Sequence, residues 1–142
     1  MKTDQLIAFL RSRRYGTVST VGASGEPQSA VVGFAFTDEG NAIFDTLSST
    51  HKAHNLRRDA RAAVVVWEGE RTVQMEGLVD EPVGPERERL LAVYLALFPD
   101  GKERLGWHGI AHFRFRPTWV RYSDYSPKAG PLVVEWVEGL GG

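Results

Sequence analysis

The first third of the sequence alternates apolar stretches with short turns, and this spacing restricts the possible folds more than any other feature. Residues 15–21 alternate small polar and apolar side chains, as expected for a strand with one buried face. Two glycines and a proline within residues 22–27 predict a hairpin turn. A return strand over 28–36 and, after the turn at 37–41, a third strand over 42–45 complete an antiparallel meander. The sequence therefore predicts an antiparallel sheet.

Further strands and helices follow in an order that suits a barrel. Residues 62–67 form a nearly continuous apolar run and residues 71–79 follow a short glycine turn, so both are predicted strands. The aromatic stretch 112–122 fits either one bent strand or two neighbouring strands. Short helices are expected at the N-terminus and from about residue 50, and a longer one from Pro85. About six antiparallel strands with inserted helices indicate a small closed or partly closed β-barrel.

The length of the chain and its last residues set the domain organisation. At 142 residues the sequence fits a single domain, residues 1–142, that is large enough to bury a hydrophobic core. Residues 126–142 carry prolines and several glycines around a short apolar run. Such a C-terminal tail has little core of its own. Its order therefore has to come from docking on the domain or on a neighbouring subunit.

The composition excludes several classes of function. With 17 basic and 18 acidic residues, the net charge of -1 gives no general attraction to nucleic acid or to an anionic membrane. The chain has no cysteine, which excludes disulfides, thiolate metal sites, iron–sulfur clusters and a cysteine nucleophile. The apolar run from Leu6 to Leu10 is too short for a signal peptide or a membrane span, so a cytoplasmic location is expected.

The stretch most informative about function runs from Asp45 to Leu56. Hydroxyl residues occupy positions 48–50 after a predicted strand, and His51 and Lys52 come next at the expected start of a helix. Because the first N–H groups of a helix are unpaired and carry partial positive charge, hydroxyls and a lysine at this point suit a phosphate. The alternative is an ordinary N-cap followed by a solvated lysine, since serine and threonine are the usual caps. The residues alone leave both interpretations open.

Four short motifs give the sequence a family resemblance. They are Gly25-Glu26-Pro27-Gln28, Asp45-Thr46, His51-Lys52-Ala53-His54-Asn55-Leu56 and Asp59-Ala60-Arg61. In this order and at this spacing, over roughly residues 5–125, the chain resembles the pyridoxamine 5′-phosphate oxidase-like family of FMN-binding split barrels. The resemblance implies a mainly β fold: a six-stranded antiparallel split β-barrel with inserted helices. It also implies a homodimer with one FMN in each of two clefts at the subunit interface.

The same resemblance assigns residues to the cofactor. The flavin ring is expected along the second strand, where Gly33 leaves room for it, and the phosphate is expected at the start of the helix. His51 stands where family members commonly carry arginine, and an imidazole lacks the fork of donors that a guanidinium offers to phosphate. Aromatic side chains of the partner subunit are expected to complete the site. The full set is Ala30, Val31, Val32, Gly33, Asp45, Thr46, Ser49, Thr50, His51, Lys52, Thr72, Gln74 and Trp119.

The substrate side departs from the oxidase proper. That enzyme ends in an Arg-Leu-His-Asp-Arg run that holds pyridoxal phosphate, whereas the equivalent segment here is Tyr122-Ser123-Asp124-Tyr125-Ser126. This segment lacks the cations that a second phosphate needs. We therefore expect a flavin-dependent oxidoreductase that acts on another small molecule. No catalytic acid or base is predicted, because the flavin carries the chemistry.

Two other functions fit the same sequence. Related split barrels use the deazaflavin coenzyme F420 in place of FMN, and the phosphate motif does not distinguish these cofactors. The second alternative is a non-catalytic flavin or haem carrier or sensor. His51 and His54 are three apart and His108 and His112 four apart, spacings that can place two imidazoles on one helical face. His112 falls in a predicted strand, however, and no acidic or cysteine ligand is near, so no metal site is predicted.

Overall fold

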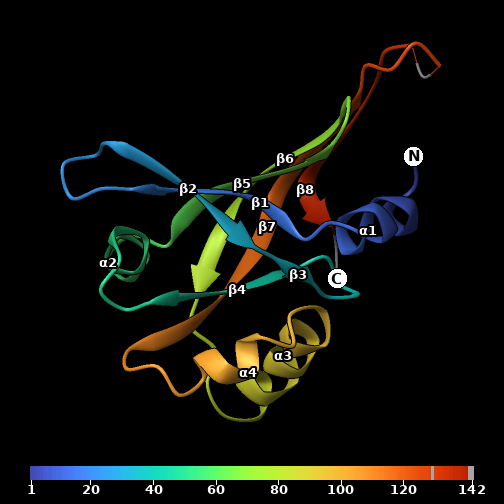
Figure 1. The fold of residues 1–142 in the computed structure, drawn as a ribbon. Helices are drawn as coiled ribbons and strands as arrows, with labels where there is room; N and C mark the ends of the chain where they lie inside the picture. The colour runs from blue at the N-terminus through green and yellow to red at the C-terminus, as the bar shows by residue number, and fades with distance from the viewer. Residues whose placement is uncertain (129, 141–142) are drawn as a thin grey trace.

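The computed structural model describes residues 1–128 and 130–140 of the chain (Figure 1). Its helices are α1 (Thr3–Arg11), α2 (His51–Arg58), α3 (Gly84–Leu97) and the short α4 (Gly101–Arg104). Its strands are β1 (Tyr15–Val21), β2 (Pro27–Gly33), β3 (Ala35–Phe36), β4 (Ala42–Leu47), β5 (Arg61–Glu68), β6 (Arg71–Asp80), β7 (Ile110–Asp124) and β8 (Leu132–Leu140). The fold is mainly β, as the sequence predicts.

The sheet curls until its two ends meet. Its strands are all paired antiparallel, in the order β2-β1-β5-β6-β7-β4-β3. β2 and β3 stand at opposite ends of this order, although only Phe34 separates them in the chain. The sheet therefore closes on itself, and the antiparallel split β-barrel expected from the sequence is confirmed (Figure 1).

The strand boundaries differ from the predicted ones at Phe34. The predicted return strand 28–36 is divided there, because the Phe34 side chain is fully buried and its N–H donates to the Arg14 carbonyl instead of to a neighbouring strand. β2 pairs with β1, and β3 pairs with β4. The meander is thus present, with a bend in its middle strand. The aromatic stretch near the C-terminus forms one long strand, β7, with a bulge opposite Glu76 and Gly77.

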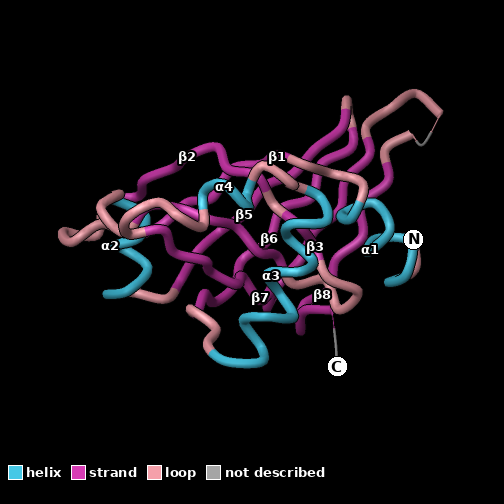
Figure 2. Tube along the Cα trace, turned by 60° about the horizontal axis from the view of Figure 1, so that its bottom comes forward, coloured by secondary structure: helices cyan, strands magenta, loops and turns pink. Residues whose placement is uncertain are grey.

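Apolar side chains from the inward faces of the strands fill the barrel. The main core includes Phe34, Phe44, Phe113 and Phe115, and α1 adds Leu6, Phe9 and Leu10 from one end. The helices lie outside the strands, with α1 and α2 at opposite ends of the molecule (Figure 2). No helix in the described part of the chain is both long and apolar enough to cross a membrane.

A second, smaller core lies outside the barrel wall. There α3 packs on the outward faces of β3 and β4, and the buried residues are Ala35, Ile43, Leu90, Tyr94 and Phe98. This layer covers part of the sheet and leaves the outward faces of β1, β2, β5 and β6 without a helix (Figure 1). The protein therefore has one covered outer surface and one open outer surface.

The C-terminal tail docks on its own domain. β8 pairs with the second half of β7, and the Trp136 indole N–H donates to the Thr3 hydroxyl at 3.1 Å. Trp136 and Leu140 also pack against the main core. Of the two docking partners that the sequence left open, the structure uses the domain itself. Residues 129, 141 and 142 of the predicted tail lie outside the described residues.

Candidate functional site

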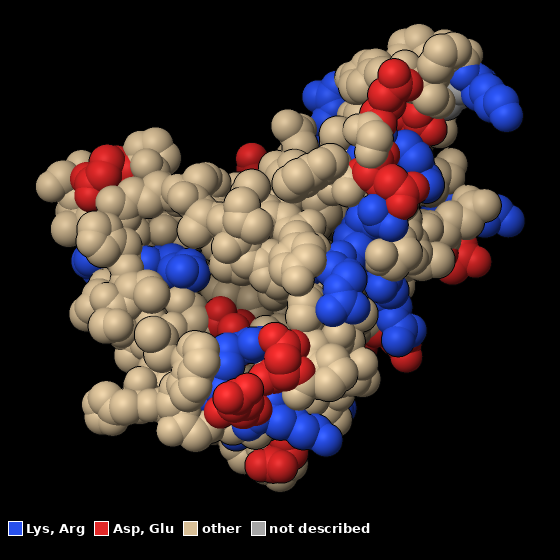
Figure 3. Space-filling model, viewed as in Figure 1, with Lys and Arg blue, Asp and Glu red and all other residues tan. Residues whose placement is uncertain are grey.

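A cavity of about 370 Å³ opens between the start of α2 and the β1–β2 hairpin. This volume lies at the lower end of the range of roughly 300–1,000 Å³ that is usual for small-molecule sites. The lining residues are Val18, Thr20, Gln28, Ser29, Ala30, His51 and Lys52. The face of the molecule in Figure 3 carries few charged side chains at its centre, where it is hollowed.

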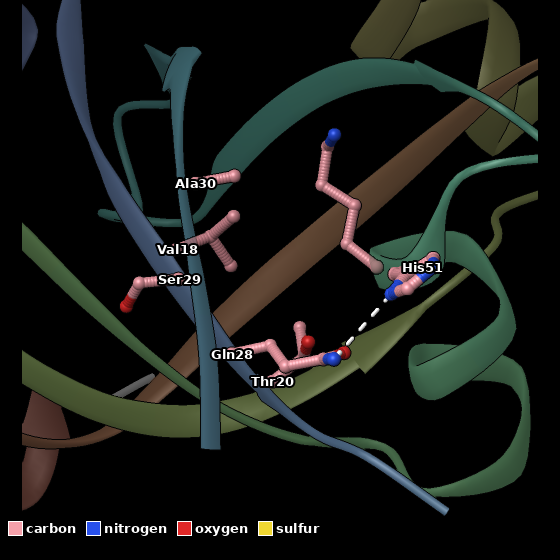
Figure 4. Close-up of a pocket in the computed structure, with 7 residues that line it drawn as sticks. Val18, Thr20, Gln28, Ser29, Ala30 and His51 are labelled. Carbon is pink, nitrogen blue, oxygen red and sulfur yellow. Dashed lines mark hydrogen bonds between the residues drawn. The ribbon is translucent and has the colours of Figure 1, made fainter. Parts of the chain in front are cut away.

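The alternation of β1 and β2 builds one wall of this cavity. Val18 pairs with Ala30 and Thr20 pairs with Gln28 across the hairpin, so all four side chains point to the same side of the sheet. In Figure 4 they face His51 of α2. Ser29 has the opposite parity, and its hydroxyl is bonded to that of Ser19 on the outer side.

The start of α2 is fixed by threonine hydroxyls. Thr50 is the N-cap, and its Oγ1 accepts the N–H of Ala53 at 3.3 Å. The Thr50 hydroxyl also lies 3.0 Å from that of Thr46 and donates to the Leu47 carbonyl at 2.9 Å. The capping interpretation is therefore confirmed for Thr50. The Thr50 side chain pairs the Ala53 N–H, and the Leu47 carbonyl pairs the Thr50 N–H at 3.0 Å. Of the amides that a helix start leaves without an intrahelical partner, those of His51 and Lys52 have no hydrogen-bond partner among the described residues.

The first turn of α2 carries basic residues where a helix usually favours acidic ones. His51 and Lys52 occupy this turn, and it contains no acidic side chain. A cation at the positive end of a helix costs about 0.3–1 kcal/mol when nothing compensates it. Lys52 is half-buried, whereas Lys2, Lys102 and Lys128 are exposed. Among the described residues, no carboxylate lines the cavity. This arrangement suits an anionic ligand.

A buried amide joins α2 to the hairpin. Asn55 Nδ2 donates to Thr20 Oγ1 at 2.9 Å and to Gln28 Oε1 at 2.6 Å, while its Oδ1 accepts from Arg58 at 2.8 Å. Gln28 Nε2 lies 3.4 Å from His51 Nδ1 (Figure 4). The network holds the basic turn against β1 and β2. The predicted site does not include Val18, Thr20 and Gln28, because the alternation of the two strands does not tell which of their faces lies against α2.

The structure brings only some of the predicted site residues together. Ala30, His51 and Lys52 line the cavity, and Ser49 is exposed in the turn before α2. Val32 points into the main core. Four further predicted residues lie on the open outward face of the sheet, and these are Val31, Thr72, Gln74 and Trp119. One copy of the chain therefore does not unite the predicted set.

Two predicted residues have structural partners instead of a free surface. The Asp45 carboxylate accepts from Arg104 at 2.7 Å beneath α4, on the side of β4 away from the cavity. A side chain at Gly33 would meet the Phe98 ring, because an added Cβ would lie 2.8 Å from its Cζ. The glycine thus makes room for Phe98, which is a different reason from the flavin approach expected from the sequence.

The covered outer layer contains two titratable groups whose pKa values are shifted by burial. Burial and the nearby Asp45 raise the pKa of Tyr94 to about 12, and its hydroxyl accepts from Arg104 at 2.9 Å. Burial, with help from Arg87, lowers the pKa of His112, whose ring nitrogens have no hydrogen-bond partner among the described residues. His108 is exposed. Within residues 1–128 and 130–140, no three potential metal ligands come together.

Solved structures with this fold differ in what they bind. A heme binding protein from Mycobacterium smegmatis superposes with a TM-score of 0.81 at 19% identity, covering 94% of this chain and 57% of that one. A pyridoxamine 5′-phosphate oxidase-related, FMN binding protein from Nostoc punctiforme superposes with a TM-score of 0.63 at 13% identity, covering 94% and 92% of the two chains. At these identities the likeness establishes the fold alone.

Sequence comparison gives the family. A pyridoxine/pyridoxamine 5′-phosphate oxidase from Burkholderia vietnamiensis is 32% identical over 106 residues, which are 73% of this chain and 48% of the oxidase. The chain thus spans about half the length of that relative. The sequence model of the pyridoxamine 5′-phosphate oxidase family matches residues 3–124. Because this match covers most of the barrel, the chain belongs to the pyridoxamine 5′-phosphate oxidase family.

Proposed function

We propose that this protein binds FMN in the cavity beside α2 and acts as a flavin-dependent oxidoreductase on a small molecule. The observation that carries the proposal is the basic first turn of α2, His51 and Lys52, beside a cavity without a carboxylate. An unfavourable local choice of this kind is expected at functional sites, where a ligand compensates for it. The phosphate of FMN would supply that compensation.

The lining residues fit both ends of the cofactor. Lys52, His51 and the first amides of α2 would hold the phosphate, since a charged donor forms the stronger hydrogen bonds to an anion. Val18 and Ala30 offer an apolar surface to the rest of the molecule. When bound, FMN supplies hydride and electron transfer chemistry. The residues of the chain would bind it, orient it and exclude water.

A homodimer with the cofactor at the subunit interface is part of the proposal. Four predicted site residues lie on the outward face of the sheet, and this face also exposes large apolar side chains. These apolar side chains are Tyr15, Val31, Trp67 and Leu78, and Val31 is 68% exposed. Large apolar side chains exposed on one face of a sheet favour an interaction surface there. A second copy packed on it would cover these side chains and could bring its own outward residues to the cavity.

The substrate is proposed to differ from pyridoxamine phosphate. The segment that would hold a second phosphate is part of β7, where Tyr122 and Asp124 pair with both β6 and β8. The Tyr122 hydroxyl accepts from Arg71 at 2.8 Å, and Asp124 accepts the N–H of Ser126 at 2.9 Å. These groups serve the sheet and its turn. A less highly charged substrate fits this segment better.

The absorbance spectrum of the purified protein tests the cofactor, together with mass spectrometry of the molecule released on denaturation. We expect flavin absorption bands and the mass of FMN. A deazaflavin spectrum or a Soret band would instead assign the cavity to the other cofactors that the fold accommodates. Protein that stays colourless and does not bind added FMN in a fluorescence titration would contradict the proposal.

Sedimentation equilibrium tests the assembly. We expect twice the 15.8 kDa mass of the chain and one flavin per chain. A charge introduced by Val31→Asp should break the dimer, since the substitution places a carboxylate in the proposed interface. Flavin occupancy is expected to fall with it. A monomer that retains full flavin occupancy would contradict a shared site.

A further inference from the structure

A directional chain of hydrogen bonds runs from the end of α2 back to its start. It links Arg58, Asn55, Gln28 and His51 in that order, with a side branch from Asn55 to Thr20. Asn55 is the centre of this relay and is only 5% exposed. Its amide is buried with both ends bonded, so its orientation is a fixed property of the fold. The relay ends on a residue of the cavity wall.

The arginine determines the direction of every bond in the relay. A guanidinium has donors and no acceptor, so Asn55 must turn its Oδ1 toward Arg58. Asn55 Nδ2 then faces the hairpin and can only donate, which requires Gln28 to present its Oε1. The two ends of an amide are ordinarily hard to distinguish. Here the arginine distinguishes them for two amides in succession.

The orientation of Gln28 in turn determines which nitrogen of the His51 ring accepts a hydrogen bond. With Oε1 bonded to Asn55, the Gln28 Nε2 group lies 3.4 Å from His51 Nδ1 and has only hydrogens to offer. His51 Nδ1 must therefore be the acceptor, and in a neutral ring the proton then resides on Nε2. His51 is an exposed residue at the first position of α2. Its Nε2–H is the free donor of the ring.

We infer that Asn55 and Gln28 are positioning residues that hold neutral His51 as the Nε2–H tautomer, so that the uncharged ring donates a hydrogen bond to the phosphate of the bound cofactor. The tautomer follows from the relay, and its use for phosphate binding rests on the proposed function. In this tautomer the neutral His51 ring directs its Nε2–H at the phosphate, so it can donate a hydrogen bond without becoming a charged imidazolium. A histidine can thereby stand where a permanently charged side chain would otherwise be expected.

The tautomer can be read directly from the ring nitrogens. In the cofactor-free protein labelled with ¹⁵N-histidine, at a pH where the ring is neutral, long-range ¹H–¹⁵N correlation spectra should show His51 protonated at Nε2. Asn55→Asp should reverse this. A carboxylate at position 55 accepts only, so Gln28 would turn its Nε2 toward it and its Oε1 toward His51, which moves the proton to Nδ1. A merely structural role of Asn55 would not change the tautomer.

Controls separate this effect from general damage. His54 is exposed on the same helix, and its signals in the same spectra should keep their pattern. If Asn55→Asp does not fold, Gln28→Glu provides the second variant, because its carboxylate sits beside His51 directly and also requires a proton on Nδ1. A thermal melt of each variant confirms that the spectra come from folded protein.

A binding cycle tests the role of the tautomer. FMN binding should weaken in Asn55→Asp by about 2- to 12-fold from the lost neutral hydrogen bond, in addition to any effect of the new charge. In a His51→Ala background the new carboxylate still affects FMN binding, but there is no imidazole whose tautomer can change. Asn55→Asp should therefore lower the FMN affinity less in that background than in the wild type. Equal costs in the two backgrounds would overturn the role of His51 as a donor.

The spectra can contradict the predicted tautomer and the titration can contradict FMN binding, each independently of the other. A mixed tautomer, or Nε2–H retained in both Asn55→Asp and Gln28→Glu, would overturn the inference whether or not FMN binds. A wild-type protein that shows the expected tautomers but binds no FMN would contradict the proposed function and also the phosphate contact. The relay itself is thus tested without the cofactor.

Discussion

The covered outer layer and the cavity treat charge in opposite ways. Beneath α3 and α4, buried charges have close partners: Arg104 binds Asp45 at 2.7 Å, and Arg114 binds Asp80 at 2.6 Å. Beside the cavity, Lys52 is half-buried and forms no ion pair with any residue in the described part of the chain. Buried charges that serve the fold are normally paired. The absence of an ion pair at Lys52 within the described residues is in keeping with the ligand-binding role proposed for it.

Hydrogen bonding shows the opposite contrast between the two regions. The buried amide of Asn55 is fully bonded, as expected for a group that holds two elements together. His112 in the outer layer has neither ring nitrogen bonded within residues 1–128 and 130–140. Burial lowers its pKa, so the ring stays neutral near pH 7 and no ion pair is required. Single substitutions can test the role of each region in stability and in ligand binding.

The largest expected effect lies in the outer layer. Arg104→Met should lower the free energy of unfolding by about 3 kcal/mol, because it leaves the Asp45 carboxylate buried without its partner. Urea denaturation measures this. Asp45→Asn in the same chain should restore part of the loss, since the unpaired charge is then gone. An unchanged urea midpoint would show that the pair contributes nothing to stability.

The next effect concerns ligand binding and leaves stability intact. Lys52→Ala should weaken FMN binding about 10- to 150-fold, because a hydrogen bond from a charged group is worth about 1.5–3 kcal/mol. The free energy of unfolding should stay the same or rise slightly, since a cation leaves the positive end of α2. Lys102→Ala, an exposed lysine of α4, is the matched control. Equal FMN affinity in both variants would remove Lys52 from the site.

A substitution at Gly33 can show whether the missing side chain makes room for the Phe98 ring or for the flavin ring. Gly33→Ala should destabilise the fold by about 1–3 kcal/mol, because the new methyl group would crowd the Phe98 ring. Phe98→Leu in the same chain should make the alanine easier to accommodate, and comparing the free energy of unfolding of the double variant with those of the two single variants measures this. If Gly33→Ala kept its stability and lost only FMN binding, the glycine would serve the cofactor instead.

The smallest expected effect is the pH dependence of stability from His112. Because burial lowers its pKa in the folded state, the unfolded chain binds the proton more readily. This contribution to stability is complete above the ordinary histidine value of about 6.5 and is lost as the pH falls toward the lowered pKa. Between pH 8 and pH 5, the urea midpoint of His112→Phe should fall less steeply than that of the wild type. The exposed control His54→Gln should follow the wild-type curve, and an identical curve for His112→Phe would contradict the assignment.

Local patterns predicted the elements well. Period-two alternation predicted β1, a continuous apolar run predicted β5, and the stretch after a short glycine turn predicted β6. The hydroxyl residues before His51 predicted a helix from about residue 50, and α2 begins at His51. These predictions succeed because strand alternation, glycine turns and N-caps act over a few residues. The family motifs likewise pointed to His51 and Lys52, which do line the cavity.

Other details of the site depend on residues far apart in the chain. Asp45 is a predicted cofactor residue, and its hydrogen-bond partner Arg104 is 59 residues away. Gly33 is a predicted neighbour of the flavin ring, and in this structure the Phe98 ring lies beside it. The sequence around Asp45 or Gly33 does not predict these distant partners. The position of Trp136 against Thr3 depends in the same way on how the two ends of the chain meet.

Local sequence patterns specify an antiparallel barrel, the approximate bounds of most strands and a basic helix start after β4. They do not specify which face of β1 and β2 lies against α2, that the Phe98 ring packs beside Gly33, or that Asp45 pairs with Arg104. Strand and helix propensities are local, whereas these choices follow from closing the sheet at Phe34 and from packing α3 on its outside. A site built between a helix and a hairpin therefore acquires its composition only when the barrel closes.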